Sequence, residues 1–198
     1  MIAKKMLLTA LVMGALTSGC GAATSEYMRP VPGPEPMGAP ADKARVVFVR
    51  PSNFANKVIF TTIDENGYFL GDSTAGSRFS VFLSPGEHYF IVWTETTETV
   101  KATLAPGKTY YVEVRPKMGM WKARASLWAV NQKSGLMKSI PSYLSDTTVT
   151  TTDFAAGQKY LNSLGNELPN AAKQGIQTYA GYSADDKADV TLMPEDGQ

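Results

Sequence analysis

The stretch Arg45-Val46-Val47-Phe48-Val49-Arg50-Pro51 opens the folded part of this chain and indicates a β-strand, because a run of β-branched and aromatic residues ends at a proline. A second stretch, His88-Tyr89-Phe90-Ile91-Val92-Trp93, is the most apolar of the expected strands. Side chains alternate between the two faces of a strand, so this stretch places apolar groups on both faces. One face should meet a core, and the other needs cover from another part of the chain.

Turn residues divide the surrounding sequence into more strands of this kind. Asp64-Glu65-Asn66-Gly67 lies between residues 57–63 and 68–72 and predicts a hairpin, because Asn and Gly both accept positive φ. Further strands are expected at residues 78–83, 97–104, 109–115 and 124–130. No helical period stands between them, so we predict an all-β domain over residues 44–131. Its form would be an antiparallel β-sandwich or small barrel of about seven or eight short strands, with a C-terminal helical appendage.

Four elements of this region, taken together, match a known arrangement. They are Arg45 to Pro51, the Asp-Glu-Asn-Gly turn, Pro85-Gly86-Glu87-His88 and Pro106-Gly107-Lys108-Thr109-Tyr110-Tyr111-Val112. Their order and spacing resemble the bacterial lipoproteins that carry domain of unknown function 2846, over about residues 41–130. The resemblance implies an envelope lipoprotein with an all-β domain and no established activity, and it transfers no catalytic residue to this chain.

The only cysteine, Cys20, lies directly behind a layout that is typical of a secretory signal. Lys4 and Lys5 give a positive start, Met6 to Leu16 form an apolar core, and small residues follow, so residues 1–19 are predicted to be a signal peptide. Because it ends on a cysteine, the layout resembles the lipobox of bacterial lipoproteins. That resemblance predicts lipidation of Cys20.

Other roles for Cys20 fit the sequence less well. The apolar run is about half of the roughly 20 residues that a membrane-spanning helix needs, and a disulfide would need a second cysteine. Ordinary secretion with cleavage near Gly19 is the remaining alternative. Because Gly21 rather than Asp follows the cysteine, the resemblance to enterobacterial lipoproteins implies an outer-membrane lipoprotein that faces the periplasm.

The charge of the chain argues against a nucleic-acid partner. Removing residues 1–19 takes away Lys4 and Lys5, so 17 of the 19 basic residues remain against 18 acidic ones, and they are scattered singly. A near-neutral protein has little attraction for anionic headgroups. Membrane attachment is therefore expected to come from the N-terminal acyl chains.

Residues 20–43 are predicted to form a lipid anchor and a proline-rich tether. In Arg29-Pro30-Val31-Pro32-Gly33-Pro34-Glu35-Pro36 the prolines remove backbone donors and hold φ near the polyproline value, so neither helix nor strand is expected. Such a spacer would hold the folded part on the order of tens of Å from the lipid. The alternative is a proline-rich ligand for a partner domain.

His88 is the only histidine, so any Ser-His-Asp or Cys-His mechanism would have to use it. At the head of a strand, its ring is expected to cap a turn or to bond a neighbouring backbone carbonyl. One histidine without a second thiol also argues against a zinc site. The sequence therefore predicts no catalytic residue, no metal and no cofactor.

Aromatic residues supply most of the candidate ligand contacts. Trp121 lies in the loop Met118-Gly119-Met120-Trp121, away from any clear strand. Together with His88 and Tyr111 it forms the set that we predict for ligand contact. Such aromatic rings either stack on a ligand such as a sugar or fill a core, and an exposed patch would distinguish the first role from the second.

Residues 132–198 differ in composition from the β-domain. Thr147 to Thr152 is a threonine-rich link, and Asp153 is the expected N-cap of an amphipathic helix. A second helix is expected with Pro169 in its first turn and Gly181 at its end. These helices either dock on the uncovered face of the sheet or bind a partner. Ser183 to Gln198, with five acidic residues and one lysine, is expected to be a mobile acidic tail.

The sequence thus predicts a lipid-anchored protein of the cell envelope that acts as a non-enzymatic structural or interaction module. Its partners would be the membrane, through the acyl chains, and another envelope protein or peptidoglycan. The alternative is a glycan- or peptidoglycan-binding module that uses surface aromatic residues.

Overall fold

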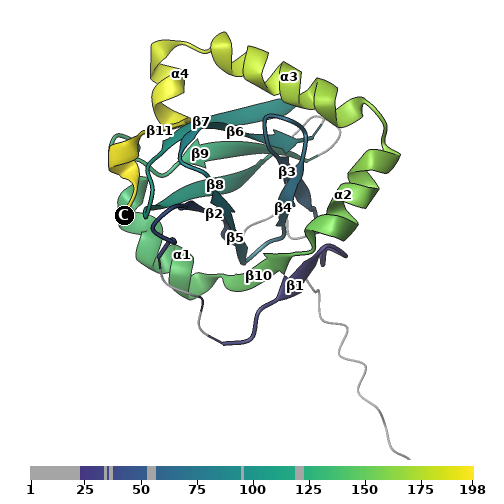
Figure 1. Cartoon of the computed structure of the whole chain (residues 1–198), viewed down its shortest axis with the longest axis horizontal. Coiled ribbons are helices and arrows are strands. Elements are labelled where there is room, and N and C mark those ends of the chain that lie inside the picture. The colour runs from purple at the N-terminus through teal and green to yellow at the C-terminus, as the bar shows by residue number, and fades with distance from the viewer. Residues whose placement is uncertain (1–22, 34, 36–37, 53–56, 95, 119–122) are drawn as a thin grey trace, which may run out of the picture.

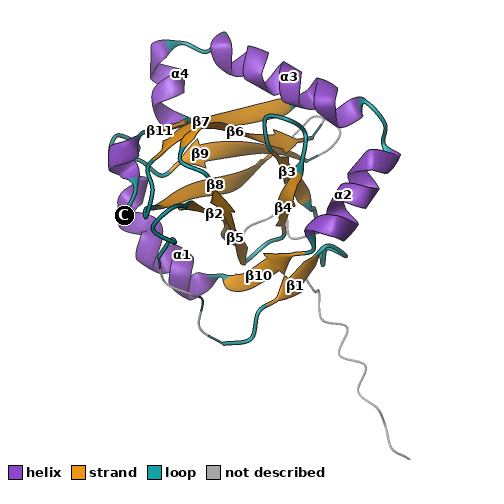
Figure 2. Cartoon of the chain, viewed as in Figure 1, coloured by secondary structure: helices purple, strands orange, loops and turns teal. Residues whose placement is uncertain are grey.

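The computed structural model describes residues 23–33, 35, 38–52, 57–94, 96–118 and 123–198. Two β-sheets pack around a shared core, and helices lie outside them (Figures 1 and 2). One sheet has six strands in the order β1 (Met28–Pro30), β10 (Thr148–Thr152), β5 (Ser77–Leu83), β2 (Ala44–Arg50), β8 (Thr109–Lys117) and β9 (Arg124–Ala129). The other has five strands in the order β11 (Thr191–Leu192), β7 (Thr97–Leu104), β6 (Gly86–Trp93), β3 (Phe60–Ile63) and β4 (Phe69–Ser73).

Helices form most of the C-terminal third of the chain. They are η1 (Leu136–Ser139), α1 (Ile140–Asp146), α2 (Phe154–Ser163), α3 (Glu167–Ala180), α4 (Ala184–Asp189) and η2 (Pro194–Asp196), of which η1 and η2 are short 3-10 helices. Of the described residues, 27% are helical and 39% lie in strands, so the fold is dominated by its sheets and the helices are added to them.

The predicted fold class, an all-β antiparallel sandwich or small barrel with a helical appendage, is wrong. Both sheets are mixed, since β2 pairs in parallel with β8, β10 with β5, and β11 with β7. The sheets do not close into a barrel. Turn residues show where a strand ends, but they do not state which strands pair. The neighbours of the central strand β2 are β5 and β8, which lie much further along the chain.

Strand β2 lies inside the six-stranded sheet and is buried along its whole length. Val46 and Phe48 face the core between the sheets, where the Phe48 ring stacks on that of Phe79 with 4.9 Å between centroids. Val47 and Val49 face the opposite side and pack against a cluster that includes residues of α1. Continuous apolar residues are typical of a strand that is covered on both faces.

The expectation that the apolar strand β6 needs cover on its second face is confirmed. Phe90 and Val92 lie in the core between the sheets, whereas Ile91 belongs to a cluster with residues of α2 and α3. A glycine in α3 permits this close contact, because a Cβ at Gly175 would lie 2.9 Å from Cγ1 of Ile91. Helices α2 and α3 therefore dock on the five-stranded sheet.

The prediction of a mobile acidic tail over Ser183 to Gln198 is also wrong. This segment forms α4, β11 and η2, and Leu192 is fully buried in the core between the sheets. At its end, the backbones of Gln198 and Thr109 exchange two hydrogen bonds of 2.8 and 3.0 Å. The prediction followed the acidic composition of the segment and overlooked Leu192, whose burial fixes the segment to the sheets.

The expected tether differs in the same way. Met28–Pro30 forms a strand, so the prediction that residues 20–43 contain no strand is wrong. Before this strand, the Ser25 hydroxyl is buried and donates to Asp72 Oδ2 at 2.6 Å. After it, Glu35 forms ion pairs with Arg45 and Arg78. Pro30 is tolerated because β1 is an edge strand.

Candidate functional site

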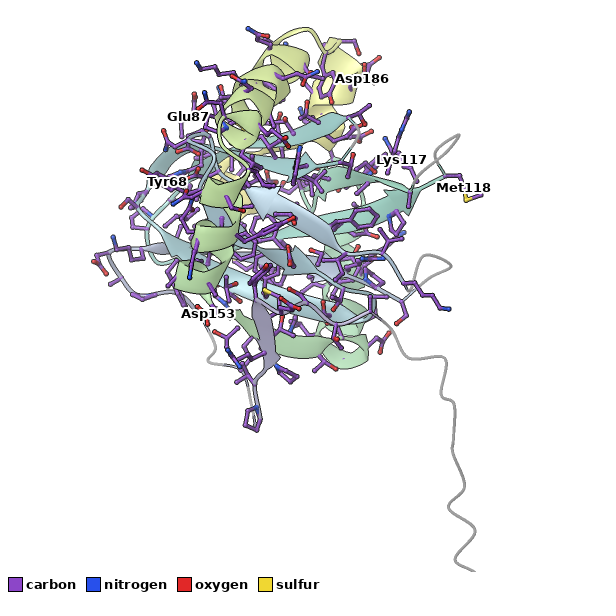
Figure 3. All side chains as sticks on the ribbon, turned by 90° about the vertical axis from the view of Figure 1, so that its right-hand side faces the viewer. Tyr68, Glu87, Lys117, Met118, Asp153 and Asp186 are labelled. Carbon is purple, nitrogen blue, oxygen red and sulfur yellow. The ribbon has the colours of Figure 1, made fainter. Side chains whose placement is uncertain are left out.

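An open groove of about 650 Å³ lies where the two sheets meet α3 and α4. We call it the β7–β9 groove, because β7, β8 and β9 supply one wall and the helices the other. Its chemically important side chains are Glu98, Lys117, Trp128, Tyr182, Asp186 and Asp189. Figure 3 shows two of them, Lys117 and Asp186, in the upper half of the molecule.

Trp128 of β9 is one of the aromatic residues that line this groove, on the face of the strand opposite the core. Ala125, Leu127 and Ala129 lie in the core between the sheets, so the even-numbered residues of the strand face the other side. Trp128 is only partly buried, and its indole Nε1 donates to Ser126 Oγ at 3.0 Å. The indole is therefore oriented by Ser126, a second residue that lines the groove.

A polar network beside the groove holds the Trp128 ring. The Arg115 guanidinium lies 4.4 Å from the ring centroid and donates to Glu113 Oε2 at 2.7 Å. The Tyr143 hydroxyl donates to the same carboxylate oxygen at 2.7 Å. Burial, and then Glu113, raises the pKa of Tyr143 to about 12, so its phenol stays protonated at neutral pH.

Glu98 is the carboxylate at the centre of a second polar group in the groove. Lys117 Nζ lies 3.5 Å from its Oε1, and the Tyr182 hydroxyl donates to its Oε2 at 3.4 Å. Burial, and then the charge of Glu98, raises the pKa of Tyr182 to about 12. Tyr182 is therefore a hydrogen-bond donor over the whole physiological range of pH.

These groups suit a polar ligand. The groove offers the two aromatic rings of Trp128 and Tyr182, the three carboxylates of Glu98, Asp186 and Asp189, and the two cations of Lys117 and Arg124. An amphipathic ring can cover the apolar face of a ligand while charged groups of both signs bind its hydroxyl, amide or zwitterionic groups. Among the described residues, no group of three His, Cys, Asp or Glu could hold a metal ion.

His88 lies outside the residues that line the groove. Its Nε2 bonds the carbonyl oxygen of Ser84 at 2.9 Å, as predicted, and its Nδ1 lies 3.3 Å from Glu65 Oε1. The hydrogen bond with Glu65 raises the pKa of His88 in spite of partial burial. Both ring nitrogens are engaged, so His88 links the β3–β4 turn to the start of β6.

The other predicted contact residues do not meet in the groove. Tyr111 is buried against Val47 and Tyr143, which places it under α1. Trp121 and the lipidation candidate Cys20 lie outside the described residues. Two aromatic residues do line the groove, Trp128 and Tyr182, and neither belongs to the predicted contact set. The small and apolar residues at alternate positions of β9 are the signal that could have shown the outward direction of Trp128.

No helix in the described ranges is long and apolar enough to cross a membrane. Comparison with known protein families, curated proteins and solved structures finds no match for this chain.

Proposed function

We propose that this protein is a lipid-anchored, non-enzymatic binding module of the cell envelope that faces the periplasm and binds its ligand in the β7–β9 groove. The observation that carries the proposal is the position of the groove. Asp186, which lines it, lies at the upper end of the molecule, whereas Asp153 and β1 lie at the lower end (Figures 1 and 3). Lipid at Cys20 would enter at the β1 end and leave the groove exposed to the periplasm.

A binding role fits the chemistry of the titratable groups better than catalysis. The ring of His88 is bonded at both nitrogens, so it has no nitrogen left to activate a nucleophile. The Glu98 carboxylate accepts from the Tyr182 hydroxyl and pairs with Lys117, so it is held by two neighbouring side chains. With these contacts, His88 and Glu98 are better suited to binding a ligand than to transferring protons in a reaction.

Within this proposal, a glycan such as a peptidoglycan fragment is the ligand class that Trp128 favours. The indole supplies a flat surface for a sugar ring, and Glu98, Gln174 and Thr178 line the same groove with groups that bond hydroxyls and amides. The alternative ligand is a polar segment of another envelope protein. Binding measurements separate the two.

Lipidation is tested by labelling cells with a palmitate analogue. We expect the wild-type chain to carry the label and to sediment with the membranes, and the Cys20→Ala variant to carry none. An unlabelled wild-type chain would show that this part of the proposal is wrong.

The groove is tested by measuring Kd for purified peptidoglycan fragments. We expect Trp128→Ala to weaken binding about tenfold, or about 1.4 kcal/mol, because the stacking surface is lost. Tyr68→Ala is the matched control, since Tyr68 is 59% exposed and does not line the groove. Equal loss in both variants would exclude the groove as the glycan site.

A wild-type chain that binds no fragment would favour the alternative ligand, a polar segment of another envelope protein. A photo-crosslinker at Met118, which is exposed and lines the groove, would trap that protein.

A further inference from the structure

The domain is fixed to its N-terminal segment very close to Cys20. Ser25 is buried and bonds Asp72, and Met28 lies in the core between the sheets. Ser25 is the fifth residue after Cys20. A chain of that length spans at most about 18 Å when fully extended. If Cys20 carries lipid, as proposed above, the surface around Ser25 must therefore lie near the bilayer and not tens of Å away.

This surface carries aromatic side chains. The Tyr27 ring stacks on that of Tyr160 with 5.4 Å between centroids, and the Tyr27 carbonyl accepts from the backbone N–H of Asp153 at 2.8 Å. Phe154, the next residue, begins α2 and is 51% exposed, and Tyr160 of the same helix is 39% exposed. We call Tyr27, Phe154 and Tyr160, with the neighbouring Arg29, the aromatic patch.

The patch is unusual among the described surfaces of the molecule. Seven large hydrophobic side chains are exposed in the described part of the chain, and α2 is the one helix or strand that carries two of them. Arg29 lies beside these rings with its side chain 70% exposed, and its guanidinium forms an ion pair of 3.5 Å with Asp153. Figure 3 shows Asp153 at the lower end of α2, on the side of the molecule where β1 lies.

We propose that the aromatic patch rests on the bilayer that holds the acyl chains of Cys20. Amphipathic aromatic rings such as those of Tyr27 and Tyr160 accumulate at the membrane–water interface. Because the segment between Cys20 and Ser25 is so short, the bilayer is the surface that the patch can contact. The patch is a second, weak membrane contact beside the lipid, and two signals together hold a protein more firmly than one acyl chain. It also fixes the orientation of the domain, with the β7–β9 groove directed away from the lipid.

The experiment uses the lipidated full chain in vesicles of phosphatidylethanolamine and phosphatidylglycerol. Phe154→Cys carries an environment-sensitive fluorophore, because an acylated Cys20 leaves the new cysteine as the sole free thiol. The matched control is Met118→Cys, which is 84% exposed and distant from Asp153 in Figure 3. We expect the probe at residue 154, and not that at residue 118, to shift to shorter emission wavelength and to be quenched by lipids with a nitroxide near the headgroup.

The same samples separate failure of the patch from failure of the anchor. Mass spectrometry of Cys20 reports its acylation independently of the fluorophore. An acylated protein whose probe at residue 154 stays in water, like that at residue 118, would overturn the patch and leave the anchor standing. A protein without acyl chains would overturn the proposed anchor itself. Tyr160→Cys repeats the measurement at a second position of the patch.

Discussion

Glu35 is the residue that fixes the proline-rich segment to the sheets. Its carboxylate bonds Arg45, Arg78 at 2.8 Å, and the Ser80 hydroxyl at 2.8 Å, and its side chain is 11% exposed. Burial alone would raise the pKa of Glu35, but the hydrogen bonds and the two guanidinium groups lower it. The chain that follows β1 is therefore held by a charged group that favours its ionised form.

The first prediction concerns this carboxylate. Glu35→Gln should lower the free energy of unfolding by about 3 kcal/mol at pH 7, because two largely buried guanidinium groups lose the negative charge between them. Because the folded-state pKa is lowered, the stabilisation is complete above the ordinary Glu pKa of about 4.3 and is lost as the pH falls toward the folded value. Urea unfolding from pH 7 to pH 3 should thus bring the two proteins together. Parallel curves would contradict this role.

A second prediction at the residue scale concerns Gly157. Alanine normally favours a helix over glycine by about 1 kcal/mol, yet here the added Cβ would lie 2.2 Å from the buried Phe69 ring. We expect Gly157→Ala to destabilise the protein by about 1–3 kcal/mol in urea unfolding. The control is Gly181→Ala, where the nearest atom would lie at 3.5 Å and φ is −79°. Stabilisation by both substitutions would show that α2 does not pack so closely.

At the scale of elements, the last residues of the chain contain two neighbours in opposite environments. Leu192 in β11 is fully buried, and the next residue, Met193, is 44% exposed. Leu192→Ala should therefore cost about 2–5 kcal/mol, as expected for a large core residue. Met193→Ala should change the free energy of unfolding by less than about 0.5 kcal/mol. Small and equal effects in urea unfolding would mean that β11 does not dock.

Local signals in the sequence predicted several elements but not their partners. Asp153 caps α2 as expected, with its carboxylate accepting from the Ala156 N–H at 3.0 Å, and Gly181 ends α3. The hairpin at Asp64 forms, although in its turn Gly67 alone has positive φ and Asp64 Oδ1 accepts from the Asn66 N–H. Caps and turns depend on nearby residues, so sequence shows them. The parallel pairing of β2 with β8 joins residues about sixty positions apart, and no local pattern encodes it.

For the molecule as a whole, the candidate site shows the same limit. The β7–β9 groove exists because β7, β8, β9, α3 and α4 meet, so its lining could not be foreseen before the pairing of the sheets was known. Only for Trp128 could the sequence have indicated a direction, because the alternation along β9 places it on the face opposite the core. The N-terminal segment was likewise predicted to be a spacer, because its prolines are visible in the sequence. The buried contacts of Ser25 and Met28 are with residues far along the chain, and the sequence does not show them.

Both ends of the described chain connect the two sheets. Ser25 bonds Asp72 of the five-stranded sheet, whereas β1 belongs to the six-stranded sheet. At the other end, β11 pairs with β7 of the five-stranded sheet, and Gln198 bonds Thr109 of the six-stranded sheet. Residues outside 44–131 thus complete both sheets and fill part of their shared core.

The last prediction follows from these connections. Residues 44–131, expressed alone, should lack a cooperative unfolding transition, because Met28 and Leu192 are missing from the core and β5 and β7 lose their outer neighbours. Residues 20–198 should instead unfold in one step, with tryptophan fluorescence and far-ultraviolet circular dichroism changing at the same urea concentration. A fragment 44–131 that unfolds cooperatively by itself would contradict this, as would two separate transitions in residues 20–198. Either result would mean that the terminal segments are additions to a complete β-domain.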